Sequence, residues 1–82
     1  MIMEDYYFYI LKGINNQYYK GITYNINKRL RQHELGQNKT TKKMKNFKLV
    51  YVEICRNRLE ARKLEKYFKS GIGREIIKEI FG

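Results

Sequence analysis

The run of strand-forming residues from Tyr6 to Leu11 constrains the fold more than any other segment of the chain. Its sequence is YYFYIL, so both alternating sets of side chains are apolar or aromatic. Successive side chains of a strand point to opposite faces of a sheet, and this pattern therefore predicts a strand that is covered on both faces. A chain of 82 residues has room for one domain, which we place at residues 1–82.

The residues after this strand predict a hairpin and then a helix. Gly13–Asn16 supplies turn residues, and Gln17–Thr23 reads as the returning strand. Asn25 is a plausible N-cap for a helix over Ile26–Leu35. Gly36 is well placed to end that helix in a left-handed conformation.

The second half of the chain predicts one more strand and two helices. Phe47–Cys55 has strand composition, and Asn57–Glu60 has the pattern of a capping box. The helix opened there is expected to run to about Ser70, where Gly71–Gly73 breaks it, and a short last helix covers Arg74–Phe81. The order ββαβαα predicts an α+β fold with a small three-stranded antiparallel sheet flanked by about three helices.

Apolar side chains at helical spacing indicate which helix faces are buried. The expected core positions of the three helices are Ile26, Leu30, Leu35, Leu59, Ala61, Leu64, Phe68, Ile76, Ile77 and Ile80. Arg29 and His33 stand four residues apart and share one helix face. Because that face lies off the stripe of Ile26 and Leu30, we expect both side chains to face solvent.

The charge of the chain points to an anionic partner. The formal net charge is +10, from 18 basic and 8 acidic residues. Such an excess opposes compaction unless an anion relieves it, and nucleic acid is the leading candidate. A structural RNA contact would explain the charge equally well. The segment from residue 36 to residue 45 contains four lysines and no acidic residue: Lys39, Lys42, Lys43 and Lys45. We expect these lysines, together with Lys20, to contact the DNA backbone.

The remaining composition predicts a soluble cytoplasmic protein without a membrane segment. No uncharged stretch is longer than seven residues, far short of the roughly 20 residues that span a bilayer, and no secretory signal is evident. The one cysteine, Cys55, excludes an intrachain disulfide and is expected to be a small buried hydrophobe.

Two tyrosine motifs, an arginine–histidine pair and a late glutamate follow one another in order. Tyr7-Phe8-Tyr9 lies in the first expected strand and Tyr19-Lys20-Gly21 in the second. Arg29 and His33 lie on the next helix, and Glu65 lies on the helix after the third strand. Over about residues 6–80 this ordered set resembles the GIY-YIG nuclease family, specifically its short single-domain bacterial members. The first glycine of the family motif is Tyr7 here, and the isoleucine of the second motif is Lys20.

The resemblance implies a DNA endonuclease that hydrolyses phosphodiester bonds with one divalent metal ion, expected to be Mg²⁺, and no small-molecule cofactor. Glu65 would hold the metal, because Mg²⁺ takes few protein ligands and keeps several waters. Arg29 would donate a fork of hydrogen bonds to the phosphate. Tyr9 or Tyr19 would position or activate the water, and His33 would assist. A single histidine excludes a zinc site of several histidines.

Two other readings remain open on the sequence. A non-catalytic nucleic-acid-binding module could have the same fold and the same basic surface. A basic protein bound to structured RNA is a further alternative, although the chain contains no RNA-recognition motif. The intact set of Tyr9, Tyr19, Arg29 and Glu65 favours the nuclease, because a binding module has no reason to keep these four residues together.

Overall fold

A computed structural model of the protein describes residues 5–38, 41 and 46–82. The elements are β1 (Tyr6–Lys12), a short 3-10 helix (Ile14–Asn16), β2 (Tyr18–Thr23), α1 (Ile26–Glu34), β3 (Lys48–Cys55), α3 (Arg58–Lys69) and α4 (Gly71–Phe81). Within these described residues, the order of three strands and three α-helices confirms the predicted α+β fold. In the described part of the chain no helix is long and apolar enough to cross a membrane.

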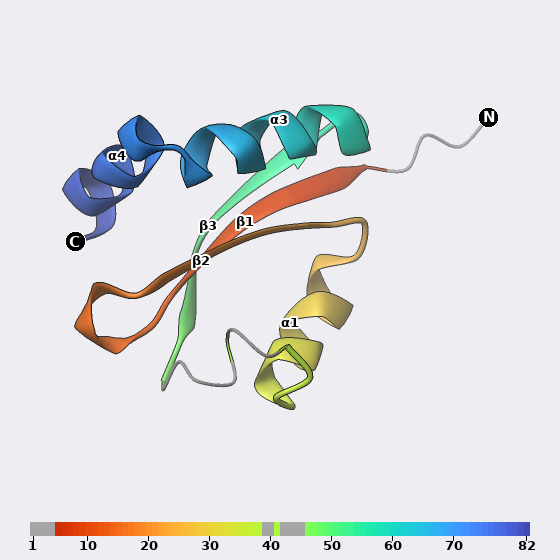
Figure 1. Ribbon diagram of the computed structural model, residues 1–82. Coiled ribbons are helices and arrows are strands. Elements are labelled where there is room, and N and C mark those ends of the chain that lie inside the picture. Colours follow the sequence, from red (N-terminus) through yellow and green to blue (C-terminus); the bar gives the residue numbers. More distant parts are fainter. Residues whose placement is uncertain (1–4, 39–40, 42–45) are drawn as a thin grey trace.

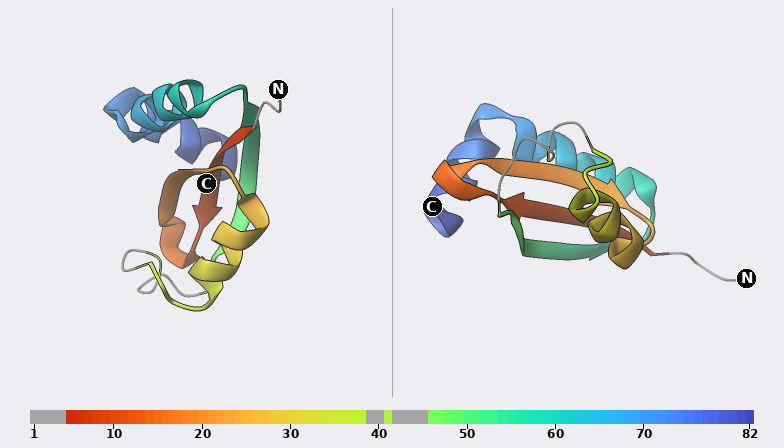
Figure 2. Two further views of the ribbon diagram at one scale, coloured as in Figure 1. Left: turned by 90° about the vertical axis from the view of Figure 1, so that its right-hand side faces the viewer. Right: turned by 90° about the horizontal axis from the view of Figure 1, so that it is seen from below.

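The sheet places β1 at its centre. The strand order is β2-β1-β3, and both pairings are antiparallel (Figure 1). Helices α3 and α4 lie over one face of the sheet, and α1 lies against the other (Figure 2). The sheet is therefore the middle layer of three, and β2 is an edge strand that both helical layers can reach.

The central strand is covered on both faces, as its sequence predicts. Phe8, Tyr9, Ile10 and Leu11 are all buried. Phe8 and Ile10 belong to the apolar core under α3 and α4, where the Phe8 and Phe68 rings stack with their centroids 5.2 Å apart. Tyr9 and Leu11 alternate with them and face α1. The two faces differ in chemistry, because the α1 side carries the polar tyrosine.

The helix caps are those that the sequence predicts, with one change. The side chains of Asn25 and Asn57 accept hydrogen bonds from the N–H groups of residues 28 and 60. Gly36 has φ 72°, the left-handed conformation expected after α1. Glu60, however, accepts from the N–H of Arg56 at 3.0 Å rather than from the cap residue itself. The carboxylate thus closes the turn one residue earlier than a standard capping box.

The boundary between the last two helices lies at Ser70 and not at the glycines. Ser70 ends α3, and its side chain accepts from the N–H of Gly73 as the N-cap of α4. The prediction that Gly71–Gly73 breaks the helix is wrong, since both glycines lie inside α4. Gly73 is there for close packing: a Cβ atom at this position would lie 2.2 Å from the Tyr67 carbonyl oxygen.

Two predicted core residues of these helices are exposed. Leu59 is 64% exposed, whereas Ala61 is buried in the same helix. Positions two residues apart are about 200° apart around a helix, so only one of the two can face the sheet. Ile77 is buried as expected, but Ile80, in the last turn of α4, is 65% exposed. Cys55 is buried, which confirms its expected role as a small core residue.

Replacing Gly73 by alanine should destabilise the fold, because the atoms that crowd the new Cβ are backbone atoms of α3 and cannot rotate away. Overpacking of this kind costs about 1–3 kcal/mol. Gly71→Ala is the matched control, since nothing lies within 4 Å of a Cβ there. It should be neutral, or stabilising by up to about 1 kcal/mol through helix propensity. Urea unfolding measures both, and equal effects of the two changes would contradict the tight α3–α4 contact.

Candidate active site

The side chain of Tyr9 crosses from the central strand to the edge strand over Gly21. These two residues are partners in the β1–β2 register. A Cβ atom at Gly21 would lie 2.6 Å from the Tyr9 hydroxyl oxygen and 2.9 Å from the Tyr19 ring. The glycine of the second tyrosine motif is therefore needed because the Tyr9 ring occupies the space of a side chain at that position.

The Tyr9 hydroxyl connects the sheet to α1. It accepts a hydrogen bond from Arg29 Nε at 3.2 Å and lies 2.7 Å from His33 Nε2. A second guanidinium nitrogen of Arg29 donates to Gln32 at 3.2 Å. Tyr9 is fully buried, with 0% of its surface exposed. These contacts fix the rotation of α1 against the sheet as well as the position of the guanidinium.

His33 is buried, and the prediction that it faces solvent is wrong. It is 1% exposed. Its ring packs edge-on against the Tyr19 ring, with a centroid distance of 4.9 Å, and its Nδ1 lies 2.7 Å from Thr41 Oγ1. The face that Arg29 and His33 share is turned toward the sheet because the buried Tyr9 hydroxyl supplies a partner for both. Arg29 is half-buried for the same reason.

The imidazole of His33 is neutral at physiological pH. Burial, together with the nearby Arg29 charge, lowers its pKa from 6.5 to about 4. Burial also raises the pKa of Tyr9 above its usual value, despite the opposing hydrogen bond from Arg29. The two groups therefore meet as a phenol and an uncharged imidazole, and no charge is buried between them.

We assign the hydrogens of this network from its geometry. A neutral imidazole donates through one nitrogen and accepts through the other. If Tyr9 donates to His33 Nε2, the other ring nitrogen, Nδ1, carries the hydrogen and donates to the Thr41 hydroxyl. That hydroxyl lies 3.5 Å from the Asn38 carbonyl oxygen and can donate to it. Every hydrogen then has an acceptor, and the Tyr9 oxygen is left to accept from Arg29.

Tyr19 is the more accessible of the two motif tyrosines. It is half-buried, and its hydroxyl accepts a hydrogen bond from Asn38 Nδ2 at 3.1 Å. Its ring lies 6.1 Å from the Tyr9 ring. Asn38 and Thr41 are part of the site but were missed from the sequence, since two polar residues after a helix have no distinguishing pattern.

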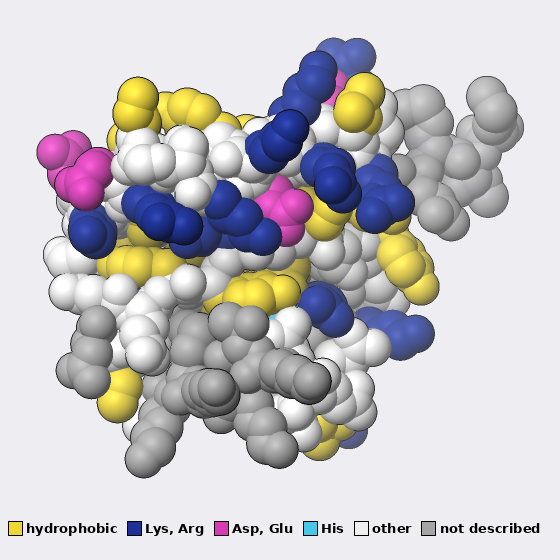
Figure 3. All heavy atoms as spheres, in the orientation of Figure 1, with side chains coloured by type: hydrophobic (Ala, Val, Ile, Leu, Met, Phe, Trp, Pro, Cys, Tyr) yellow, Lys and Arg dark blue, Asp and Glu magenta, His cyan; other side chains and the backbone are white. Residues whose placement is uncertain are grey.

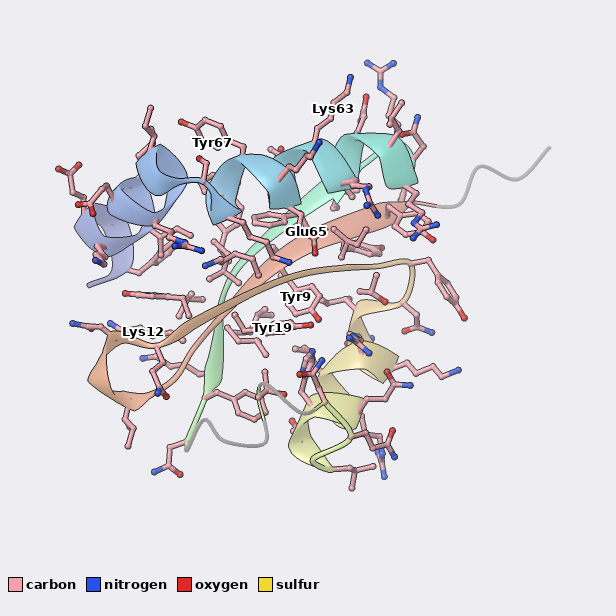
Figure 4. The ribbon with its side chains drawn as sticks, viewed as in Figure 1. Tyr9, Lys12, Tyr19, Lys63, Glu65 and Tyr67 are labelled. Atoms are coloured by element: carbon pink, nitrogen blue, oxygen red, sulfur yellow. The ribbon has the colours of Figure 1, made fainter. Side chains whose placement is uncertain are left out.

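Glu65 approaches the same edge of the sheet from the other helical layer. Figure 4 shows its side chain extending from α3 toward the strands, on the side where Tyr9 and Tyr19 lie. The side chain is 22% exposed, and its carboxylate accepts from Lys69 Nζ at 3.3 Å. Arg29 and Glu65 thus flank the edge strand β2 from opposite faces of the sheet.

Glu65 is the side chain at this edge that could hold a metal ion. In residues 5–38, 41 and 46–82 no group of three or more His, Cys, Asp or Glu side chains could hold a metal together. A lone, partly exposed carboxylate matches the habit of Mg²⁺, which binds through one or two carboxylates and retains its waters. Of the predicted DNA contacts, Lys20 lies on β2, whereas Lys39, Lys42, Lys43 and Lys45 lie outside the described residues.

The buried neutral His33 should make folding stability depend on pH. Its folded-state pKa lies below the usual value, so between about pH 6.5 and pH 4 the unfolded chain binds a proton that the folded chain does not. This contribution to stability is complete above pH 6.5 and is lost as the pH falls toward 4. The melting temperature of the wild type should therefore drop more between neutral pH and about pH 5 than that of His33→Gln.

The chain contains one histidine, so no second imidazole complicates the comparison. An NMR titration of the imidazole gives the same quantity directly. A midpoint near 6.5, or equal pH dependence of the two proteins, would show that His33 is not held neutral in the folded state.

Comparison with known proteins shows the family to which the chain belongs. The family model of the GIY-YIG catalytic domain matches residues 5–74. The UPF0213 protein YazA of Bacillus subtilis is 33% identical over 70 residues, which cover 84% of this chain and 71% of that protein. A UPF0213 protein of Bacillus licheniformis is 39% identical over 70 residues, covering 84% and 72%.

A solved structure shares the fold. The solution NMR structure of a UPF0213 protein from Bacillus halodurans is similar with a TM-score of 0.56 at 27% identity, over 95% of this chain and 86% of that one. The match of the catalytic-domain model covers most of the chain and includes Tyr9, Tyr19, Arg29 and Glu65. The protein therefore belongs to the GIY-YIG nuclease family, alongside short bacterial UPF0213 proteins.

Proposed function

We propose that the protein is a DNA endonuclease that hydrolyses a phosphodiester bond at the β2 edge with one divalent ion, Mg²⁺. The observation that carries this proposal is the placement of Arg29 and Glu65 on opposite sides of β2, with the motif tyrosines between them. A cation and a carboxylate placed in this way can hold a phosphate and a metal side by side. Members of the family are generally nucleases, which supports the same reaction.

Arg29 is the group proposed to bind the scissile phosphate. Tyr9 and Gln32 accept hydrogen bonds from two of its nitrogens, and none of the ion pairs among the described residues involves it, so its charge is available to an anion. A hollow of about 240 Å³ lies next to it, lined also by Thr23 and Lys28. A guanidinium that is already fixed loses little entropy on binding and gives a planar, two-pronged contact to phosphate oxygens.

Tyr19 is the better candidate for orienting the attacking water. Tyr9 is fully buried and, because its pKa is raised, remains a phenol at neutral pH. Tyr9 is thus proposed as a positioning residue that fixes Arg29 and, with His33, the first helix. Tyr19 is half-buried and lies at the edge strand, where its hydroxyl can face a water.

Glu65 would hold the metal. When bound, the ion supplies Lewis-acid stabilisation of the charge that grows on the phosphate and the leaving oxygen. The carboxylate itself is already hydrogen-bonded to Lys69, which keeps it oriented. Lys69 can then also face the substrate, because it needs only part of its hydrogen-bonding capacity for Glu65.

Glu65→Gln should abolish divalent-dependent nicking of plasmid DNA, with a loss of at least about a hundredfold, since an anchored Lewis acid contributes several kcal/mol and each 1.4 kcal/mol is tenfold. DNA binding in EDTA should be unchanged or tighter, because a negative charge that faces phosphate is removed.

The matched control is Glu79→Gln, which makes the same change at an exposed position of α4. It should cleave at the wild-type rate. If the wild type bound DNA but showed no divalent-dependent nicking, or if Glu65→Gln nicked as fast as the control, the non-catalytic nucleic-acid-binding module would be the better account.

A further inference from the structure

A second cationic hollow lies between β2 and α4, away from Arg29. It has a volume of about 180 Å³ and is lined by Asn16, Tyr18, Lys20, Arg74, Ile77 and Lys78. Tyr18 and Lys20 alternate with Tyr19 along β2, so they face the α3–α4 side of the sheet while Tyr19 faces α1. The hollow therefore occupies the same strand edge as the candidate active site, on the side from which Glu65 approaches.

The positive charges of this hollow are incompletely neutralised. Among the described residues no carboxylate forms an ion pair with Lys20 or Arg74, whereas Lys78 pairs with Glu75 at 3.9 Å. Burial lowers the pKa of Lys20, and the nearby charges of Arg74 and Lys69 lower it further. Cations held together in this way destabilise the free protein, and an anion between them would relieve the repulsion.

The hydroxyl of Tyr18 is a buried polar group without a hydrogen-bond partner in the part of the chain that the structure describes. A buried hydroxyl left in this state destabilises the folded protein. Lys12 also lies near the Tyr18 ring, with its Nζ 5.9 Å from the centroid. Because the hydroxyl has almost no accessible surface, the groups of the hollow that can meet an anion are its lysine and arginine side chains.

Lys69 is close to both the hollow and the candidate active site. Lys69 donates to Glu65, and its charge also acts on Lys20. Figure 3 shows Lys and Arg side chains gathered in a band across this face of the molecule, with an acidic side chain among them. A chain of phosphates along β2 would meet Arg29 first, then Glu65 and Lys69, and then the second hollow.

We propose that this hollow binds a backbone phosphate of the DNA strand, beyond the phosphate that is cleaved, through Lys20 and Arg74. The inference rests on the proposed function only in taking DNA as the ligand. It gives the protein a second anchor that sets the direction of the strand across the site. The group that the hollow would bind is a phosphate, which could come either from the DNA backbone or from free inorganic phosphate.

The test is the salt dependence of binding to a short fluorescent DNA duplex in EDTA. Cleavage does not occur without a divalent ion, so the result can be interpreted whether or not the protein proves to be a nuclease. Lys20→Gln and Arg74→Gln should each reduce the slope of log K against log salt by about 0.9, the value for one phosphate contact. Lys63→Gln is the control for charge, because Lys63 points away from the strands on the outer side of α3 (Figure 4), and it should leave the slope unchanged.

Tyr18→Phe separates the charged side chains from the buried hydroxyl. Because the hydroxyl has almost no accessible surface, its removal should leave DNA binding and the salt slope unchanged. The melting temperature of the free protein should stay the same or rise, because an unpartnered buried hydroxyl is removed. A large loss of DNA binding at an unchanged melting temperature would show that the hydroxyl takes part, and would overturn the assignment of the contact to Lys20 and Arg74.

Inorganic phosphate distinguishes the two sources of the ligand. In an NMR titration, DNA should shift the amides of residues 18–20 and 74, and phosphate should do so only weakly and be displaced by DNA. Tight binding of phosphate that DNA does not displace would make the hollow a free-anion site. Equal salt slopes for Lys20→Gln, Arg74→Gln and Lys63→Gln would likewise overturn the proposal.

Discussion

The hydroxyl of Tyr9 is the contact on which the arrangement of the site depends. It lies over Gly21 and is held between Arg29 on one side and His33 on the other. Helix α1 has a narrow apolar stripe and, in the described residues, buries no apolar side chain completely. Its placement on the sheet is therefore determined in large part by hydrogen bonds, and those same bonds orient the guanidinium proposed to bind phosphate.

The two faces of the sheet differ in composition: one carries the apolar core, and the other carries the polar network of the candidate site. On one face Phe8, Ile10, Ala61 and Ile77 form an apolar core under α3 and α4. On the other face a buried polar network stabilises the structure only while each member is satisfied. Because β2 is an edge strand, side chains from both faces reach it. Glu65 can thus come from the apolar, stable layer and Arg29 from the polar one.

The sequence predicted those features that depend on local patterns. The doubly apolar strand, the asparagine caps and the left-handed Gly36 all follow from residues close to one another in the chain. The burial of His33 could not be predicted in the same way, because it depends on a hydroxyl that arrives from a strand 24 residues earlier. The helix boundary at Ser70 was missed because Gly73 serves a close helix contact, and in the sequence such a glycine looks like a helix breaker. The ordered family motifs singled out Tyr9, Tyr19, Arg29 and His33, and these side chains lie in contact in the structure. No pattern in the sequence indicated their partners Asn38 and Thr41.

The central claim is that groups from both faces of the sheet meet at one site at the edge of β2, where Glu65 would hold the ion and Arg29 would bind the phosphate. Paramagnetic broadening of the protein's NMR signals by Mn²⁺, used in place of Mg²⁺, tests this most directly. The account predicts selective broadening around Glu65 together with Tyr19 and the Arg29 side chain, and loss of that broadening in Glu65→Gln. Broadening that spared Tyr19 and Arg29, or that persisted in Glu65→Gln, would place the ion elsewhere and contradict the account.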